Sequence, residues 1–222
     1  MNANKVIIAI PTCSPKRIPM LIRTVESIQA GEYKNVHPVI LADGNAQIER
    51  EAKEKLHNVS VIANRERMDW VFSVNRIFRE FDSDYYIFAS DDLFFPPDCI
   101  TCAMTRMGEC FPNGFGVVSI GKKNKTTFGL FGRKWADHFP DRQVFCPDFI
   151  HYAGDSELMR TVRTLDKYAF PPKRDSSVQH SRPKDDTWRL ARSVRTRDHT
   201  IRDERIEKGY IWGVDFNLVT RQ

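Results

Sequence analysis

Two adjacent carboxylates, Asp91 and Asp92, follow an aromatic segment that begins at Tyr85. Carboxylates placed side by side at the end of a strand repel each other unless a cation shares them, and oxygen atoms are the ligands that Mg²⁺ and Mn²⁺ prefer. The pair therefore predicts a site for a divalent cation, whose coordination shell a bound diphosphate would complete. The simpler alternative is a turn in which Asp92 or a neighbour caps the following helix.

Polar residues follow the other predicted strands in the same way. They are Pro11, Thr12 and Arg17 after the first strand, Asp43 after the second, and Arg65 after the third. In open α/β sheets a ligand lies outside the carboxyl ends of the strands, so we expect these residues to gather with the aspartate pair around one site. None of the turns carries the G-x-G-x-x-G pattern of dinucleotide folds or the G-x-x-x-x-G-K-[ST] phosphate loop, which argues against a dehydrogenase and a P-loop NTPase.

The hydrophobic periodicity predicts the elements that carry these residues. Short apolar runs rich in β-branched or aromatic residues predict strands at residues 6–10, 37–43, 59–63, 85–90 and 117–120. Helical patterns lie at 18–28, 46–56, 70–81, 98–107 and 155–165, with Gly31 as a left-handed C-cap of the first helix. Successive strand and helix units imply an α/β fold with a parallel sheet covered by helices on its faces.

The C-terminal part of the chain has a different pattern. Residues 121–149 mix Gly, Lys and aromatic residues, which predicts loops and a β-hairpin, and the proline-containing residues 170–186 predict a loop that divides the sheet from a basic tail. The tail shows helical periodicity and carries six arginines between Arg189 and Arg205. These arginines predict either a solvated helix face of ion pairs or a surface that contacts a polyanion.

The composition predicts one soluble, intracellular domain. The chain has 222 residues, 41% of them hydrophobic, and a net charge of +5, which favours an anionic partner. The strongly apolar run near the start ends at Pro11, so it is too short for a signal peptide or a membrane span. The five cysteines are odd in number and predict free thiols, and Cys99, Cys102 and Cys110 lack the second Cys or His pair that a zinc site needs.

Four segments together resemble a known family. The stretches VIIAIPTCSPKRIPMLIRTVESI, VILADGN, YYIFASDDLFFPPD and HYAGDSEL are similar, in order and spacing, to nucleotide-sugar glycosyltransferases of the GT-A fold, especially family 2 and its relatives, over roughly residues 5–180. The resemblance implies a Rossmann-type, mostly parallel sheet with helices on both faces. It also implies a catalytic domain over residues 1–170, on which a C-terminal loop and basic helical tail (residues 171–222) pack.

In that family an acidic motif after the fourth strand holds the metal that bridges the donor's diphosphate. By this resemblance Asp92 is the direct metal ligand and Asp91 contacts the ribose or supports the metal site, while Ser90 stands in place of one of the family's acids. His180 lies where several GT-A enzymes provide a further metal ligand, and an imidazole suits Mn²⁺ better than Mg²⁺. The alternative for His180 is a solvated loop residue.

The resemblance also implies a nucleotide site. The residues that would border the nucleoside are Pro11, Thr12 and Arg17. Asp43 would accept a hydrogen bond from a uracil imide N–H, which suits a UDP-linked donor, although many relatives carry a second aspartate where this chain has Ala42. Arg65 and Arg67 could pair with the diphosphate, and the alternative is that both are exposed loop arginines.

Asp155, in the segment HYAGDSEL, matches the acidic motif that supplies the catalytic base in inverting members of the family. An alcohol is a poor nucleophile at neutral pH, and a carboxylate within hydrogen-bond reach can take its proton as the sugar carbon is attacked. The alternative, compatible with the first role, is an N-cap for the following helix with Glu157 in its first turn.

These residues predict a metal-dependent, inverting glycosyltransferase that uses Mn²⁺ or Mg²⁺ and moves a sugar from a UDP-linked donor to an acceptor hydroxyl. The segment KDDT before the basic tail is similar to compact glycosyltransferases of bacteriophages, some of which modify hydroxylated bases of phage DNA. DNA or another anionic polymer is therefore the expected acceptor. Two alternatives stay open: a nucleotidyltransferase, which usually has a glycine-rich first loop where this chain has PTCSP, and a non-catalytic nucleic-acid-binding module on the same fold.

Overall fold

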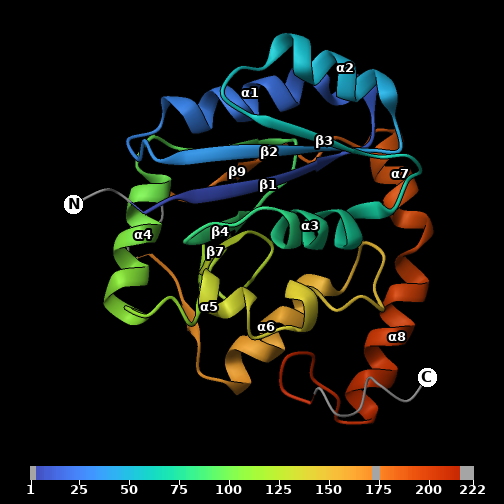
Figure 1. Ribbon diagram of the computed structural model, residues 1–222. Coiled ribbons are helices and arrows are strands. Elements are labelled where there is room, and N and C mark those ends of the chain that lie inside the picture. Colours follow the sequence, from blue (N-terminus) through green and yellow to red (C-terminus); the bar gives the residue numbers. More distant parts are fainter. Residues whose placement is uncertain (1–3, 172–175, 216–222) are drawn as a thin grey trace.

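A seven-stranded sheet forms the central layer of the protein (Figure 1). The computed structural model describes residues 4–171 and 176–215. The strands are β1 (Val6–Thr12), β2 (Val36–Asp43), β3 (Ser60–Asn64), β4 (Tyr85–Phe88), β6 (Val117–Ser119), β7 (Gly129–Gly132) and β8 (Tyr168–Ala169), in the order β3-β2-β1-β4-β7-β6-β8. Neighbouring strands are parallel except at β7, which runs antiparallel between β4 and β6. The mostly parallel α/β sheet predicted from the sequence is confirmed.

Helices cover both faces of this sheet (Figure 1). On one face lie α1 (Ile18–Ala30), α2 (Ala46–Lys55) and α4 (Cys99–Cys110), and on the other lie α3 (Asp69–Glu80), α5 (Arg133–Ala136) and α6 (Gly154–Thr164). Successive residues of a strand point to opposite faces, so β1 contributes to two separate core clusters. Ile8 packs in the cluster under α1, and Ala9 packs in the cluster under α3.

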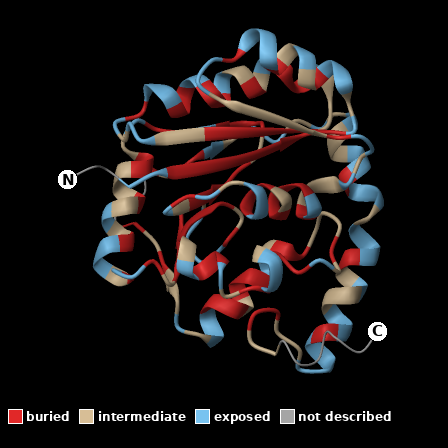
Figure 2. Cartoon of the chain, viewed as in Figure 1, coloured by how far each residue is buried: buried red, intermediate tan, exposed pale blue. Residues whose placement is uncertain are grey.

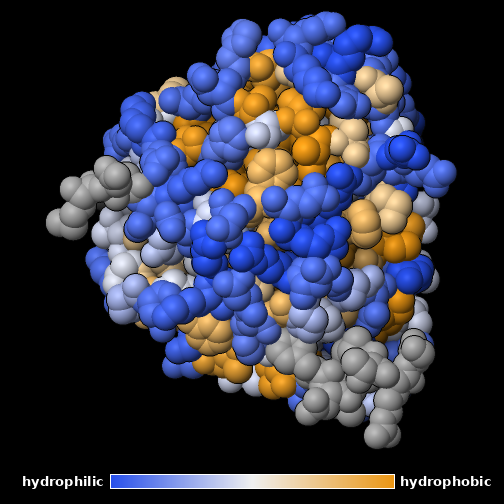
Figure 3. All heavy atoms as spheres, viewed as in Figure 1, coloured by the Kyte–Doolittle hydropathy of each residue, from blue (hydrophilic) through white to orange (hydrophobic). Residues whose placement is uncertain are grey.

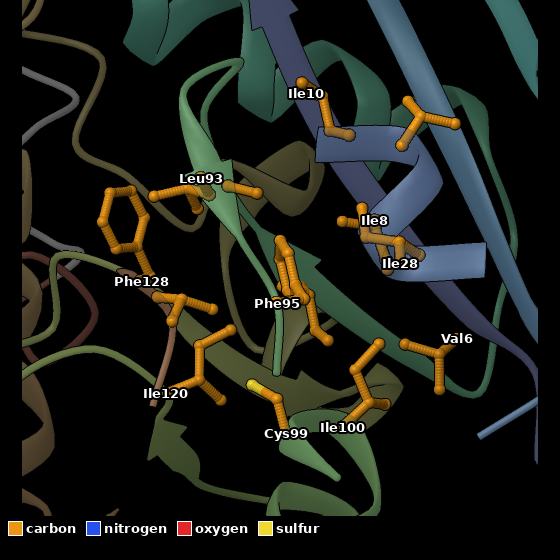
Figure 4. Packing of buried hydrophobic residues seen from close by; sticks show 14 of the residues in the cluster. Val6, Ile8, Ile10, Ile28, Leu93, Phe95, Cys99, Ile100, Ile120 and Phe128 are labelled. Atoms are coloured by element: carbon orange, nitrogen blue, oxygen red, sulfur yellow. The ribbon is translucent and has the colours of Figure 1, made fainter. Parts of the chain in front are cut away.

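The strand β1 lies inside the sheet, between β2 and β4. All of its residues are buried, as Figure 2 shows. In the cluster of Figure 4, Val6 and Ile8 of β1 lie near Ile28 of α1 and Ile100 of α4. Burying an aliphatic side chain of this size contributes about 1.5–3 kcal/mol. The residues that follow β1 are therefore held on a well-packed support.

The outer surface differs from this core. Hydrophilic residues cover most of the face in Figure 3, and hydrophobic residues are visible between α2 and α3, where the edge strand β3 runs. In residues 4–171 and 176–215, no helix combines the length and the apolar character that crossing a bilayer requires. The five cysteines are free, as their odd number predicts.

The end of α1 differs from the predicted left-handed glycine cap. Gly31 has φ −60° and ψ 163°, which is an extended conformation. Its N–H donates to the carbonyl of Ile28, and the N–H of Glu32 donates to the carbonyl of Pro97 at 2.8 Å. A tertiary hydrogen bond to a distant turn therefore ends the helix, and the sequence around Gly31 contains no sign of that partner.

Residues 121–149 contain more regular structure than the predicted loops and hairpin. One strand, β7, inserts between β4 and β6, and α5 follows it directly. The pattern Gly-Leu-Phe-Gly lacks the alternation that indicates a strand. Small residues are needed at both ends, because a Cβ at Gly129 would lie 2.9 Å from the Phe88 ring and one at Gly132 would lie 2.5 Å from the carbonyl oxygen of Gly114.

The predicted loop at residues 170–186 also contains a strand. β9 (Gln179–His180) pairs antiparallel with β5 (Leu93–Phe94) and places His180 opposite Leu93. Residues 172–175 of this segment lie outside the described residues. The helices α7 (Asp186–Ser193) and α8 (Arg195–Glu207) then run along the edge of the molecule where β1 and β2 end (Figure 1). The segment thus returns the chain to the carboxyl ends of the central strands.

Candidate active site

A cavity of about 400 Å³ lies at the carboxyl ends of β1, β2 and β4. Of the residues predicted for the site, those that line this cavity are Pro11, Thr12, Arg17, Asp43, Asp91, Asp92, Asp155 and His180. Arg65 is exposed and does not line it, whereas Arg67 does. The cavity therefore joins side chains from the beginning, the middle and the last part of the chain.

Asp91 is a buried carboxylate held on both of its oxygens. Thr12 Oγ1 donates to Asp91 Oδ2 at 2.6 Å, and Arg17 Nη1 donates to Asp91 Oδ1 at 2.8 Å. Burial raises the pKa of Asp91, against the opposing effects of Arg17 and Thr12. Short charge-assisted hydrogen bonds fix the orientation of a carboxylate, so Asp91 is an ordered part of the cavity wall.

Arg17 connects Asp91 to the C-terminal segment. Its Nε donates to Asp185 Oδ2 at 2.8 Å and its Nη2 donates to Asp185 Oδ1 at 3.0 Å, which makes a bidentate pair. Asp185 is also the N-cap of α7, where it accepts the N–H of Trp188 at 3.0 Å. Although partial burial opposes the effect, the hydrogen bonds from Arg17 and Trp188 lower the pKa of Asp185. Arg17 thus ties the segment after β1 to the start of α7.

Asp92 faces His180 at the edge of the cavity. His180 Nε2 lies 3.1 Å from Asp92 Oδ1 and 3.2 Å from Asp92 Oδ2, and Ser90 Oγ donates to Asp92 Oδ1. Although burial opposes the effect, the hydrogen bonds from His180 and Ser90 lower the pKa of Asp92, so this carboxylate is charged near neutral pH. The pairing of β9 with β5 brings the two residues together, because His180 is opposite the residue that follows Asp92.

The donor atoms at this point suit a divalent metal. A carboxylate oxygen and an imidazole nitrogen are ligands that Mn²⁺ accepts. Arg182 Nε donates to His180 Nδ1 at 3.0 Å, so the ring proton is on Nε2 in this arrangement and points to Asp92. Coordination through Nε2 would therefore move the ring proton to Nδ1 and displace Arg182. Within the described residues, no group of three or more His, Cys, Asp or Glu side chains is placed to hold an ion.

Asp43 organises the loop between β3 and α3. Its Oδ1 accepts from Asn64 Nδ2 at 2.7 Å and from the N–H of Met68 at 2.8 Å, and its Oδ2 accepts the N–H of Asp69 at 2.9 Å. Burial raises the pKa of Asp43, and these three hydrogen bonds oppose that effect. A carboxylate oxygen can accept two hydrogen bonds, so Oδ2 has the capacity for one more beside that from Asp69.

The same loop presents Arg67, and not Arg65, to the cavity. Arg67 Nε donates to Asp69 Oδ1 at 2.9 Å, which orients the guanidinium. Gly44 allows the loop to close on the end of β2: its φ is +70°, and a Cβ there would lie 2.4 Å from the backbone nitrogen of Arg67. The sequence shows two arginines two positions apart, and the closed loop decides which of them turns inward.

Asp155 lies in the first turn of α6 and is half-buried. Its Oδ1 accepts the N–H of Ser156 at 2.8 Å, and Thr127 Oγ1 lies 3.4 Å from its Oδ2. The N-cap of α6 is Ala153, at φ 64° in the left-handed region, so the alternative in which Asp155 is the N-cap is wrong. Glu157 shares this turn but is 1% exposed and paired with an arginine of α8. Asp155 is therefore the carboxylate of this turn that lines the cavity.

The sequence-based site omits several aromatic and histidine side chains of the cavity wall. His151 and Tyr152 precede α6, and Trp188 lies on α7. Burial lowers the pKa of His151, which keeps its ring neutral near pH 7. The buried carboxylate of Asp198 on α8 accepts the N–H groups of Ile150, His151 and Tyr152 at 3.1, 2.8 and 2.7 Å. His151 lies in the HYAGDSEL segment, whereas nothing in the sequence of the tail singles out Asp198.

The chain belongs to glycosyl transferase family 2, because residues 7–168 match the model of that family. Its mostly parallel sheet and its structural neighbours show the GT-A fold. No curated protein matches the chain.

Two solved structures illustrate the shared fold. The mannosyltransferase PcManGT from Pyrobaculum calidifontis, in complex with GDP-Man and Mn²⁺, is 17% identical with a TM-score of 0.68, and the match covers 92% of this chain and 65% of that chain. TarS 1-349 from S. aureus is 13% identical with a TM-score of 0.59, covering 76% of this chain and 58% of that one, and its complex with UDP matches at 12% identity. This chain therefore spans less than two thirds of the length of these proteins.

Proposed function

We propose that this protein is a metal-dependent, inverting glycosyltransferase that moves a sugar from a UDP-linked donor to an acceptor hydroxyl. The observation that carries the proposal is the cavity at the carboxyl ends of β1, β2 and β4. It collects the adjacent side chains Asp92 and His180 and the half-buried Asp155 around a space of about 400 Å³. A cavity of this size at the carboxyl edge of an α/β sheet suits a nucleotide-sugar.

The proposed donor contacts lie at the ends of β1, β2 and β4. Pro11, Thr12 and Arg17 border the nucleoside, and Asp91 contacts the ribose or supports the metal site. The open acceptor position on Asp43 Oδ2 is proposed to take the uracil imide N–H. Arg67 is the arginine proposed for the diphosphate, because it lines the cavity and Arg65 does not. TarS binds UDP and PcManGT binds GDP-Man, so the choice of uracil rests on Asp43.

Asp92 and His180 are the proposed ligands of Mn²⁺ or Mg²⁺. The lowered pKa of Asp92 keeps its carboxylate ready to bind a cation, and the nitrogen of His180 favours Mn²⁺. PcManGT was solved with Mn²⁺. When bound, the ion supplies Lewis acidity that offsets the charge developing on the leaving diphosphate. Ser90 orients Asp92 through its hydrogen bond, and Arg182 holds the His180 ring while no metal is bound.

Asp155 is the proposed general base. Its Oδ1 is engaged by the N–H of Ser156, which leaves Oδ2, near Thr127 Oγ1, to take the proton of the acceptor hydroxyl. Proton transfer to a positioned carboxylate contributes about 10²–10⁴-fold to the rate. Attack by the hydroxyl on the side of the sugar opposite the leaving diphosphate inverts the configuration at the sugar carbon.

We propose a catalytic domain over residues 1–170, with residues 171–222 packed on it as a loop and a basic helical tail, although residues 1–3, 172–175 and 216–222 lie outside the described residues. The ion pair of Arg17 with Asp185 supports this packing, because it joins the two parts. The proposed acceptor is a nucleic acid or another anionic polymer, and hydroxylated bases of phage DNA are the specific candidate. Two exposed arginines, Arg192 of α7 and Arg195 of α8, lie against aromatic rings that line the cavity and favour an anionic acceptor.

Product analysis tests the reaction type. With a nucleotide-sugar and Mn²⁺, we expect release of the nucleoside diphosphate. Release of pyrophosphate instead indicates a nucleotidyltransferase, and no turnover together with tight nucleic-acid binding indicates a non-catalytic module. A thermal-shift series with different nucleoside diphosphates tests the donor: UDP with Mn²⁺ should raise the melting temperature most, because a ligand of the native state stabilises it. A larger shift with GDP contradicts the choice of uracil, and a shift independent of Mn²⁺ contradicts the metal role.

A further inference from the structure

A shallow depression of about 390 Å³ lies where α7 meets α8. Its lining consists of Arg192, Arg195, Thr196, His199, Thr200 and Asp203. Arg192 and Arg195 are exposed. The carboxylate of Asp203 is paired with Arg202 at 2.7 Å, so its charge is compensated from outside the depression. The depression therefore carries a net positive charge from its two arginines.

These two arginines differ from the others of the tail. The tail arginines that form ion pairs with aspartate or glutamate are Arg189, Arg197, Arg202 and Arg205. Within residues 4–171 and 176–215, Arg192 and Arg195 form no ion pair. Ion pairs thus account for four of the six arginines, of which Arg205 is buried, and leave two charges without a partner carboxylate.

Two aromatic rings separate the depression from the candidate active-site cavity. The Arg192 guanidinium lies 4.8 Å from the centroid of the Trp188 ring, and the Arg195 guanidinium lies 5.9 Å from the centroid of the Tyr152 ring. Both rings also line the cavity. His199, in the wall of the depression, meets Tyr152 edge-on with centroids 6.0 Å apart. The depression therefore begins directly behind the aromatic wall of the cavity.

We propose that this depression binds the phosphodiester backbone of a single-stranded nucleic-acid acceptor, with Arg192 and Arg195 as its phosphate contacts. The inference rests on the proposed function, because it concerns the acceptor of the same site. Guanidinium groups bind phosphate oxygens through forked hydrogen bonds, and aromatic rings stack on unpaired bases. A nucleic-acid strand uses both features, with phosphates in the depression and a base turned toward Tyr152, Trp188 and the cavity. A base inside a duplex would first have to leave its stack.

Binding of a fluorescein-labelled, single-stranded oligodeoxynucleotide, followed by fluorescence anisotropy over a salt series, tests this inference. The double variant Arg192→Gln/Arg195→Gln should bind more weakly. The logarithm of the association constant decreases with the logarithm of the salt concentration, and the steepness of this decrease should become smaller by about 1.4 in the variant. Each phosphate contact on a single strand contributes about 0.7 to it. The double variant Arg192→Lys/Arg195→Lys keeps both charges and should restore the slope. Its melting temperature and that of the glutamine variant should match the wild type, because both side chains are exposed.

The matched control is Arg23→Gln/Arg50→Gln, which removes the same charge from exposed positions on α1 and α2 and should bind like the wild type. The inference is overturned if the glutamine variant of Arg192 and Arg195 keeps the wild-type slope, because the two arginines then contact no phosphate. It is also overturned if the control loses binding equally, because net charge alone would then attract the strand. Equal competition by inorganic polyphosphate, matched by charge, overturns the choice of a nucleic acid, since polyphosphate carries no bases.

The Mn²⁺-dependent rise in melting temperature of the wild-type enzyme with UDP is measured separately and tests the donor site of the proposed function without an acceptor. If this rise occurs and the slope does not depend on Arg192 and Arg195, the inference fails and the proposed function stands. If no rise occurs although binding depends on both arginines, the proposed function fails and the depression is a nucleic-acid contact without a donor site.

Discussion

Asp198 is the residue of α8 whose replacement should damage the site most. Its carboxylate is 0% exposed, accepts three backbone N–H groups at 3.1, 2.8 and 2.7 Å, and pairs with Arg197 at 2.9 Å. Alanine leaves these three partly buried donors without an acceptor. Each unsatisfied buried donor costs about 1–3 kcal/mol, so Asp198→Ala should lower the free energy of unfolding by about 3–5 kcal/mol after water reaches part of the loop.

The milder variant Asp198→Asn separates positioning from stability. Its amide oxygen still accepts hydrogen bonds while its NH₂ group faces a backbone donor, so we expect a loss of about 1–3 kcal/mol. The loop that Asp198 holds, residues 150–152, leads into Ala153, at φ 64°, and then into Asp155. A shift of this loop therefore displaces the proposed base. In the folded variant kcat should fall about tenfold or more, because small displacements of catalytic groups are costly. The rise in melting temperature on binding UDP should be retained, because the proposed donor contacts Asp43 and Asp91 lie at the carboxyl ends of β2 and β4 and not in this loop.

The matched control is Glu204→Gln, which removes one exposed charge from the same helix and should change the free energy of unfolding by less than about 0.5 kcal/mol. Urea unfolding measures the stability of each variant, and steady-state kinetics separate kcat from the donor KM. The reasoning is refuted if Asp198→Ala unfolds within about 1 kcal/mol of the wild type. A parallel loss of kcat and of the UDP thermal shift in Asp198→Asn would likewise show a general loss of the fold instead of a positioning role.

Other parts of the site give simpler tests. Asp155→Asn should lower kcat by about 10²–10⁴-fold in a product-release assay and keep the UDP thermal shift. Asp92→Asn should abolish the Mn²⁺-dependent part of that shift. Normal turnover in either variant would contradict the role proposed for that residue. Gly44→Ala should destabilise the protein by about 2–4 kcal/mol in urea unfolding, because φ is +70° and the new Cβ would lie 2.4 Å from the backbone nitrogen of Arg67. The pKa of His151 is lowered in the folded state, so as the pH falls the unfolded chain takes up a proton before the folded protein does. The free energy of unfolding should therefore decrease as the pH falls below about 6.5, by at most about 1.4 kcal/mol per pH unit. His151→Gln should flatten that part of the stability profile, and an unchanged profile would contradict the burial of the neutral ring.

The convergence of the strand ends could be predicted because parallel pairing brings them to one edge. β1 pairs with β2 so that Thr12 is opposite Ala42, next to Asp43, and with β4 so that Ala9 is opposite Phe88. Short apolar strands separated by amphipathic helices determine this arrangement with little dependence on side-chain detail. The predicted fold was therefore right even where element ends were displaced by a few residues.

The remaining parts of the site depend on long-range contacts that no local pattern contains. The choice between Arg65 and Arg67 follows from a loop closed by Asp43, and the sequence gives both arginines equal standing. His180 reaches Asp92 because two very short strands pair, and strands of two residues have no detectable period. Asp198 has the sequence context of a surface aspartate among arginines, and its burial appears only when α8 packs against the loop before α6.

The same contacts show why α7 and α8 are not a free arm. Asp185 at the start of α7 is bonded to Arg17, which is bonded to Asp91 on the proposed donor side of the cavity. Asp198 on α8 holds the loop that leads to Asp155, on the proposed acceptor side. A flexible basic segment would attract a polyanion without placing it, because its charges would move independently of the cavity. These two contacts lie on either side of Arg192 and Arg195 and hold them beside the aromatic wall of the cavity, so a phosphate bound there would also position the acceptor hydroxyl.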